Sequence, residues 1–172
     1  MHCALASLEE METALLLVRP HVPETPTSTH PTLDAELGCR IWLKHENETP
    51  AGAFKVRGGI VYLHELLKHH PDISGVIAAS TGNHGRSIAW SARRLGLRCV
   101  IVVPIGNPVQ KNEAIRALGA ELVEHGSDFQ SALEHSRELA AEERLHPVPS
   151  FHSWLVQGVA TYALEFFRAT PE

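Results

Sequence analysis

The sequence predicts an α/β fold in which a small domain, with three layers around a parallel sheet, is joined to an incomplete part of a larger α/β domain. Two observations predict this class. Gly75–Ala79 and Cys99–Val103 are short, continuous apolar runs, which is the composition of strands buried on both faces of a sheet. Segments with helical periodicity separate such runs, and the connections are short. Alternating strands and helices of this kind form right-handed βαβ units around a parallel sheet.

Each expected element has its own local signal. The segment up to about Val18 has helical periodicity, and Pro20, Pro23, Pro26 and Pro31 then predict an extended, irregular loop. The remaining elements are expected, in order, as a strand at Arg40–Lys44, a helix at Ala53–Leu67, a strand at Gly75–Ala79, a helix at Asn83–Gly96, a strand at Cys99–Val103, a helix at Pro108–Gly119, a strand at Glu121–Glu124, a helix at Ser127–Arg144 with Ser127 as its N-cap, a short strand at Val148–Phe151 and a helix at Trp154–Arg168.

Charge and composition exclude several classes of protein. The chain carries a net charge of −5 and its lysines and arginines are scattered, so nucleic acid is not an expected partner. A hydrophobic content of 44% is typical of a globular protein, and no apolar stretch reaches the roughly 20 residues of a membrane span. Because the first residues also lack the basic start of a secretory signal, we expect a cytoplasmic protein with no membrane partner.

Neither the cysteines nor the histidines predict a metal site. Cys3, Cys39 and Cys99 lie far apart and form no CxxC pair, so we expect free thiols of a reducing compartment. The 12 histidines lack HExxH spacing and are dispersed along the chain. We therefore expect them to be surface side chains and not metal ligands.

A lysine lies where an expected strand gives way to an expected helix. The segment reads PAGAFKVRGG from Pro50 to Gly59, and Lys55 falls in the first turn of the helix. The positive end of the helix dipole and apolar neighbours such as Phe54 both disfavour a charged amine there. A neutral amine is what Schiff-base chemistry requires. Taken alone, the segment is better explained by an exposed lysine whose stem covers an apolar surface.

A second segment follows the apolar run Gly75–Ala79 and opens the next helix. It reads STGNHG from Ser80 to Gly85. Its glycines let the backbone approach a ligand, and the N–H groups at a helix start attract an anion. The carboxyl end of a parallel strand is also where open α/β sheets bind ligands. The segment contains neither GxGxxG nor GK[ST], and on its own an ordinary turn capped by Ser80 or Asn83 explains it better.

Together, the two segments resemble the fold-type-II pyridoxal-phosphate enzymes (tryptophan synthase β-like), and within them the threonine/serine dehydratases and serine racemases. PxGAFKxRGG followed by STGNHG carries the likeness, which extends from about Pro23 to the end of the chain through LGCRIWLKHEN, CVIVVP, KN…ALGAEL and GVATYALE. The cysteine-synthase branch differs, because it has a KDR-type lysine context and SGNTG. The resemblance divides the chain into residues 1–72 of the large cofactor domain, a small α/β domain at 73–151 and a return into the large domain at 152–172.

The resemblance also implies a role for each site residue. Lys55 binds pyridoxal 5'-phosphate as a Schiff base and then removes the α-proton of a small amino acid substrate. Phe54 packs beside the cofactor ring, and Asn83 hydrogen-bonds its phenolic oxygen. The implied ligands of the substrate carboxylate are Ser80, Thr81, Gly82, Asn83 and His84. The implied reaction eliminates water from L-threonine or L-serine and gives a 2-oxo acid and ammonia.

Other readings remain open at this point. Racemases of this branch have serine where this chain has Thr81, as the catalytic acid on the opposite face of the substrate, so serine racemase activity is a second candidate. A 3-hydroxyaspartate ammonia-lyase uses the same fold. A third candidate, from another class, is a non-catalytic truncated pseudoenzyme or interaction module that retains Lys55 and Asn83.

The resemblance implies that part of the cofactor site lies outside this chain. The family's glycine-rich phosphate loop and the partner of the pyridine nitrogen are expected beyond Glu172, since no glycine follows Gly158. We therefore expect weak cofactor binding and little or no turnover by these 172 residues alone. The expected partner is a second copy in a homodimer or a complementary C-terminal half.

Overall fold

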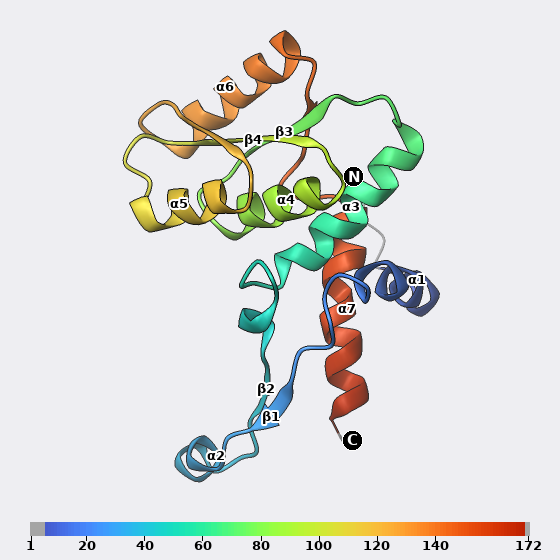
Figure 1. Cartoon of the computed structure of the whole chain (residues 1–172). Coiled ribbons are helices and arrows are strands. Elements are labelled where there is room, and N and C mark those ends of the chain that lie inside the picture. Colours follow the sequence, from blue (N-terminus) through green and yellow to red (C-terminus); the bar gives the residue numbers. More distant parts are fainter. Residues whose placement is uncertain (1–5, 171–172) are drawn as a thin grey trace.

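Seven α-helices and six strands make up the part of the chain that the computed structural model describes, residues 6–170 (Figure 1). In chain order they are α1 (Leu8–Val18), β1 (Thr27–Thr29), α2 (Pro31–Leu37), β2 (Trp42–Lys44), the 3-10 turn η1 (Glu46–Glu48), α3 (Lys55–His69), β3 (Gly75–Ala79), α4 (Asn83–Arg94), β4 (Arg98–Val103), α5 (Val109–Ala117), β5 (Glu121–Glu124), α6 (Phe129–Glu142), β6 (His146–Pro147) and α7 (Ser153–Ala169).

A four-stranded parallel sheet forms the centre of one part of the molecule. Its strand order is β5-β4-β3-β6, with Ile77 opposite Val100 and Val76 opposite His146. Helix α6 covers one face, while α4 and α5 cover the other, which gives three layers (Figure 1). The predicted parallel-sheet α/β fold is therefore confirmed.

Alternate side chains of the central strands supply the two cores of this sheet. Val76 and Ile101 pack with Ile88 of α4 in one cluster. Ile77 packs with Ala132 of α6 in the other. The continuous apolar composition of β3 and β4 thus has a direct cause, because neither face of these strands meets water.

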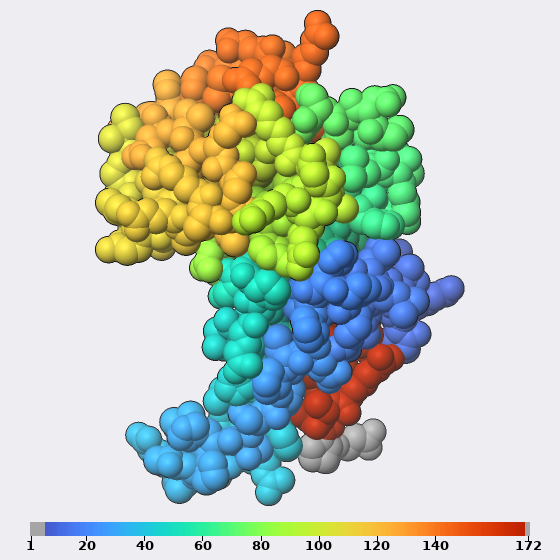
Figure 2. Space-filling view, viewed as in Figure 1, coloured from blue at the N-terminus to red at the C-terminus, as the bar shows by residue number. Residues whose placement is uncertain are grey.

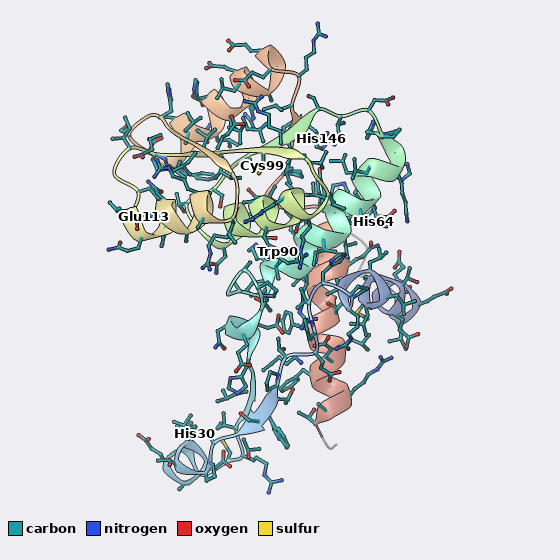
Figure 3. All side chains as sticks on the ribbon, in the orientation of Figure 1. His30, His64, Trp90, Cys99, Glu113 and His146 are labelled. Carbon is teal, nitrogen blue, oxygen red and sulfur yellow. The ribbon has the colours of Figure 1, made fainter. Side chains whose placement is uncertain are left out.

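Helices α1, α3 and α7 pack together beside the sheet and form a second core (Figure 1). Ala14 and Val18 of α1 and Val56 of α3 are buried there. Trp90 of α4 belongs to the same cluster, and Figure 3 places it at the junction between α4 and the helices below the sheet. The side chain of Trp90, from a helix that covers the sheet, therefore packs in the core that α1, α3 and α7 form.

The segment from β1 to β2 extends away from both cores as a projection (Figure 2). β1 and β2 pair antiparallel, with Ser28 opposite Leu43, and α2 lies between them. The predicted irregular, proline-rich loop is confirmed for residues 19–26, but the prediction was wrong from Thr27 on, where β1 and α2 form. Pro31 occupies the start of α2, where its missing N–H needs no partner, and Gly38 ends that helix in the left-handed region at φ 67°.

Two further details differ from the sequence prediction. The N-cap of α6 is Asp128, whose carboxylate accepts the N–H of Ser131 at 2.8 Å, and not Ser127. The last strand is His146–Pro147 and not Val148–Phe151, because pairing with β3 ends once the Val148 N–H reaches the Ile77 carbonyl at 2.8 Å.

The two cysteines that the structure describes differ in exposure. Cys39 is exposed, Cys99 is buried, and both are free, whereas Cys3 lies outside the described residues. Burial, and after it the charge of Glu121, raises the pKa of the Cys99 thiol to about 12, so this thiol is unreactive. Within residues 6–170 no helix has the length and apolar character needed to cross a membrane.

Candidate active site

The STGNHG segment joins the carboxyl end of β3 to the start of α4. Ser80 is buried, and its Oγ accepts the N–H of Gly82 at 3.3 Å and of Gly85 at 2.8 Å. Gly85 lies so close to the sheet that a Cβ would come within 3.1 Å of Ile101 Cγ2. The loop is therefore fixed to the sheet by packing and by hydrogen bonds. The first-turn N–H groups of Asn83 and His84 have no carbonyl of the helix to bond and remain for a ligand.

Replacing Ser80 with alanine should lower the free energy of unfolding by about 1–2 kcal/mol, because two loop N–H groups lose their acceptor inside the protein. Urea titration of the variant measures this loss. Ser127→Ala is the matched control, since Ser127 is exposed and Asp128 caps its helix, and we expect a change below about 0.5 kcal/mol. Equal losses in both variants would mean that Ser80 is not a specific cap.

Lys55 is the first residue of α3, and the turn before it is held by Thr49. The Thr49 hydroxyl donates to the Ala53 carbonyl at 3.0 Å and accepts the Ala53 N–H at 2.9 Å. Gly52 provides the left-handed conformation at φ 69° that this turn requires. The Lys55 side chain is partly exposed, with Nζ 5.8 Å from the centre of the Phe54 ring. An accessible amine thus stands at a rigid helix start.

A hydrogen bond and a charge effect connect Lys55 to the helix that the STGNHG segment opens. Ser87, one turn into α4, donates its hydroxyl to the Lys55 carbonyl at 2.6 Å. Burial, and in second place the charge of Lys55, lowers the pKa of His84 from 6.5 to about 4. His84 Nε2 is shielded from solvent and has no hydrogen-bond partner among the described residues. The ring of His84, which is partly buried, is therefore neutral at pH 7.

The predicted site residues gather at one place, with different exposures. Ser80 is buried, Thr81, Gly82 and His84 are partly buried, and Asn83 is exposed at the start of α4. Phe54 is 37% exposed, and its ring centre lies 5.8 Å from that of Tyr162 of α7. Sequence reasoning missed Ser87 and Tyr162. Helical spacing from His84 was the available signal for Ser87, and the place of Tyr162 in the GVATYALE stretch was the signal for that residue.

The comparisons with known proteins identify the family. The profile of the pyridoxal-phosphate-dependent enzymes (PALP) matches residues 18–172. The chain belongs to this family. The predicted cofactor, pyridoxal phosphate, is the cofactor of the family, and the residues fit it: Lys55 offers an accessible amine, and Phe54 an aromatic face. His84 Nε2 is a buried polar atom without a partner in residues 6–170, as in a site built to contact a ligand.

Individual members of this pyridoxal-phosphate-dependent family are similar to the chain over most of its length. The biosynthetic L-threonine dehydratase of Haemophilus influenzae is 36% identical over 145 residues, which is 84% of this chain and 28% of the relative. The solved pyridoxal 5'-phosphate-dependent aspartate racemase has a TM-score of 0.92 at 30% identity, over 97% of this chain and 52% of that one. Maize serine racemase has a TM-score of 0.90 at 26% identity, over 98% and 51%. The chain thus spans about half the length of these solved structures.

Proposed function

We propose that this chain is the lysine-bearing part of an ammonia-lyase that eliminates water from L-threonine or L-serine, giving a 2-oxo acid and ammonia. One observation carries the proposal. The Ser87 hydroxyl donates to the Lys55 backbone carbonyl at 2.6 Å, which joins the residue that carries an accessible amine to α4, whose start is suited to a carboxylate. Similarity to L-threonine dehydratase supports this choice of substrate class.

The cofactor supplies an electron sink for the carbanion that forms at the substrate α-carbon. Lys55 Nζ would hold the cofactor through its aldehyde and would accept the proton from the substrate α-carbon. Phe54 would offer an aromatic face to the cofactor ring, and the Asn83 amide would donate to its phenolic oxygen. These roles explain why an aromatic residue directly precedes the lysine and an amide opens α4.

The substrate carboxylate is bound at the start of α4 by neutral donors. Ser80 Oγ already accepts two N–H groups, so its own O–H is left to donate. Thr81 adds a second hydroxyl, and Gly82 leaves the backbone open to the ligand, since a Cβ there would meet nothing within 4 Å. His84, with its pKa lowered to about 4, donates as a neutral ring and holds the carboxylate without adding a charge near Lys55.

We also propose a domain division, a location and a partner for this chain. Residues 1–72 and 152–172 form the cofactor domain and residues 73–151 the small domain. The enzyme acts on small amino acids in the cytoplasm, and it is completed by a second copy or by a complementary C-terminal half. Joining the chain with such a half is expected to give elimination activity.

The absorbance of the 172-residue chain with added pyridoxal phosphate tests the proposal. We expect a visible band from lysine-bound cofactor that is absent in Lys55→Ala, because this substitution removes the amine. Lys68→Ala is the matched control, since Lys68 is exposed at the other end of α3, and the band should persist. A band of equal strength in Lys55→Ala would refute the role of Lys55, and no band in the wild type would refute a working cofactor site in this chain.

Serine racemase activity is the second candidate, supported by the similarity to solved serine and aspartate racemases. Thr81 supplies the hydroxyl that this reaction needs on the substrate face opposite Lys55. Chiral analysis of L-serine after incubation with the completed enzyme separates the two reactions: D-serine that disappears in Thr81→Val indicates racemisation. Consumption of 3-hydroxyaspartate alone would instead indicate a 3-hydroxyaspartate ammonia-lyase. Association with a C-terminal half that yields no activity would support a non-catalytic interaction module.

A further inference from the structure

A buried arginine holds the first turn of α3 from the side opposite the cofactor lysine. Arg57 is 0% exposed and bonds two carboxylates with its guanidinium fork. Its Nε and Nη2 donate to Glu46 at 2.8 and 2.9 Å, and its Nη1 and Nη2 donate to Glu165 at 3.0 and 2.8 Å. Paired bonds of this kind fix both the distance and the orientation of the side chains they join.

Glu165 is the centre of this buried ion cluster. It is 2% exposed, and besides Arg57 it meets Lys44 Nζ of β2 at 2.8 Å and Arg19 at 3.2 Å. Burial alone would raise the pKa of Glu165, but the hydrogen bonds from Arg57 and Lys44 hold it below its usual value. Glu165 is therefore ionised, and three positive side chains depend on it.

The cluster acts on the helix turn that begins with Lys55. On an α-helix, residues two positions apart in the sequence are about 200° apart around the axis, so Arg57 and Lys55 point to opposite sides. The backbones of α3 and α7 also touch here, because a Cβ on Gly58 would lie 2.6 Å from the Leu155 carbonyl oxygen. The α4 hydroxyl of Ser87 holds the same turn from a third direction. These contacts thus fix the backbone of Lys55, and only its side chain is free to rotate.

We propose that Arg57 and Glu165 are positioning residues, which use the buried ion cluster to fix the first turn of α3 and so aim Lys55 at the cofactor. This inference rests on the proposed function and deepens it, since neither residue contacts the reacting atoms. Glu165 lies 108 residues after Arg57, so a distant residue of α7 helps to position Lys55.

Hydrogen exchange and chemical trapping test the proposal with the variants Glu165→Gln and Arg57→Lys. Exchange needs no cofactor: amide exchange in the peptide around Lys55 should rise by about tenfold or more, while α6 stays unchanged. For trapping, the chain is mixed with pyridoxal phosphate and reduced with borohydride, and the adducts are counted by peptide mass. The ratio of adduct on Lys55 to adduct on exposed Lys68 should fall about fivefold or more.

Matched variants make the result specific. Arg168→Gln removes an exposed ion pair with Glu12 from the same helix α7, and we expect neither readout to change. If Glu165→Gln does not fold, Thr25→Val serves in its place, because it removes only the hydroxyl that donates to Glu46 at 2.6 Å. This variant should loosen the same turn to a smaller degree.

The outcomes separate this inference from the proposed function. Exchange that is unchanged around Lys55, or that rises equally throughout the chain, overturns the positioning role whether or not the cofactor binds. Local exchange that rises with a lower Lys55 ratio supports it. Wild-type chain that traps no more cofactor on Lys55 than on Lys68 refutes the proposed function, while exchange still decides the positioning of the turn.

Discussion

Replacing Gly158 with alanine is expected to lower the free energy of unfolding by about 3 kcal/mol, one of the largest effects of any single methyl group in this chain. A Cβ at this position of α7 would lie 2.7 Å from Gly58 Cα and still closer to the Arg57 carbonyl oxygen. These are backbone atoms, which cannot rotate away, so the two helices must separate. The better helix propensity of alanine returns only about 1 kcal/mol.

Urea unfolding followed by circular dichroism measures this loss. Gln157→Ala is the matched control, because it introduces the same residue at the neighbouring position of α7 and removes only a 3.3 Å bond to Glu10. We expect the control to change the free energy of unfolding by less than about 0.5 kcal/mol. A Gly158→Ala variant as stable as the control would show that α3 and α7 are not in backbone contact.

Acid is expected to destabilise the chain through His84, by up to about 3 kcal/mol. The pKa of this ring is lowered to about 4 in the folded chain, from an ordinary value of 6.5. Between these two values the unfolded chain binds a proton on His84 that the folded chain does not. The stability that the neutral His84 ring contributes to the folded chain is therefore fully present above about pH 6.5 and is lost as the pH falls towards 4.

The free energy of unfolding measured from pH 7 to pH 4 tests this assignment. In His84→Gln the slope over this range should become shallower, since no proton can bind there. Ser127→Ala provides the comparison, because Ser127 is exposed and its replacement removes no titratable group, and its slope should match that of the wild type. Identical slopes in all three proteins would contradict a buried, neutral His84.

The parts of the fold that local chemistry determines were predicted from the sequence. β3 and β4 were found because, apart from Arg98 at the start of β4, their residues are apolar and buried on both faces. The helix of Lys55 was found from its periodicity, and the STGNHG segment from its place after a buried strand. Each of these signals lies within a few residues of the element it predicts.

The parts that depend on distant partners were not predicted. β1 is only three residues long and exists because it pairs with β2, on the far side of α2. Ser127 and Asp128 are equally good caps by residue type, so only the backbone path of the loop decides between them. The buried state of His84 comes from the packing around it, which no short motif records.

The same limit applies to the candidate site. Lys55, Ser80 and His84 were named from the two motifs, whereas Glu165 ends the GVATYALE stretch, to which the resemblance gave no role in the site. A glutamate in such a helix usually faces water. Its burial becomes apparent only when Arg57 and Lys44, from two other elements, are placed against it.

The distance along the chain between Arg57 and Glu165 has a consequence for synthesis. The strands and helices of the sheet lie between them, in residues 75–147, and they can pair as soon as they leave the ribosome. The Arg57–Glu165 contact closes a loop of 108 residues and must wait for α7. A nascent chain paused before α7 would therefore carry a finished sheet, while Arg57 in the first turn of α3 would still lack the carboxylate of Glu165.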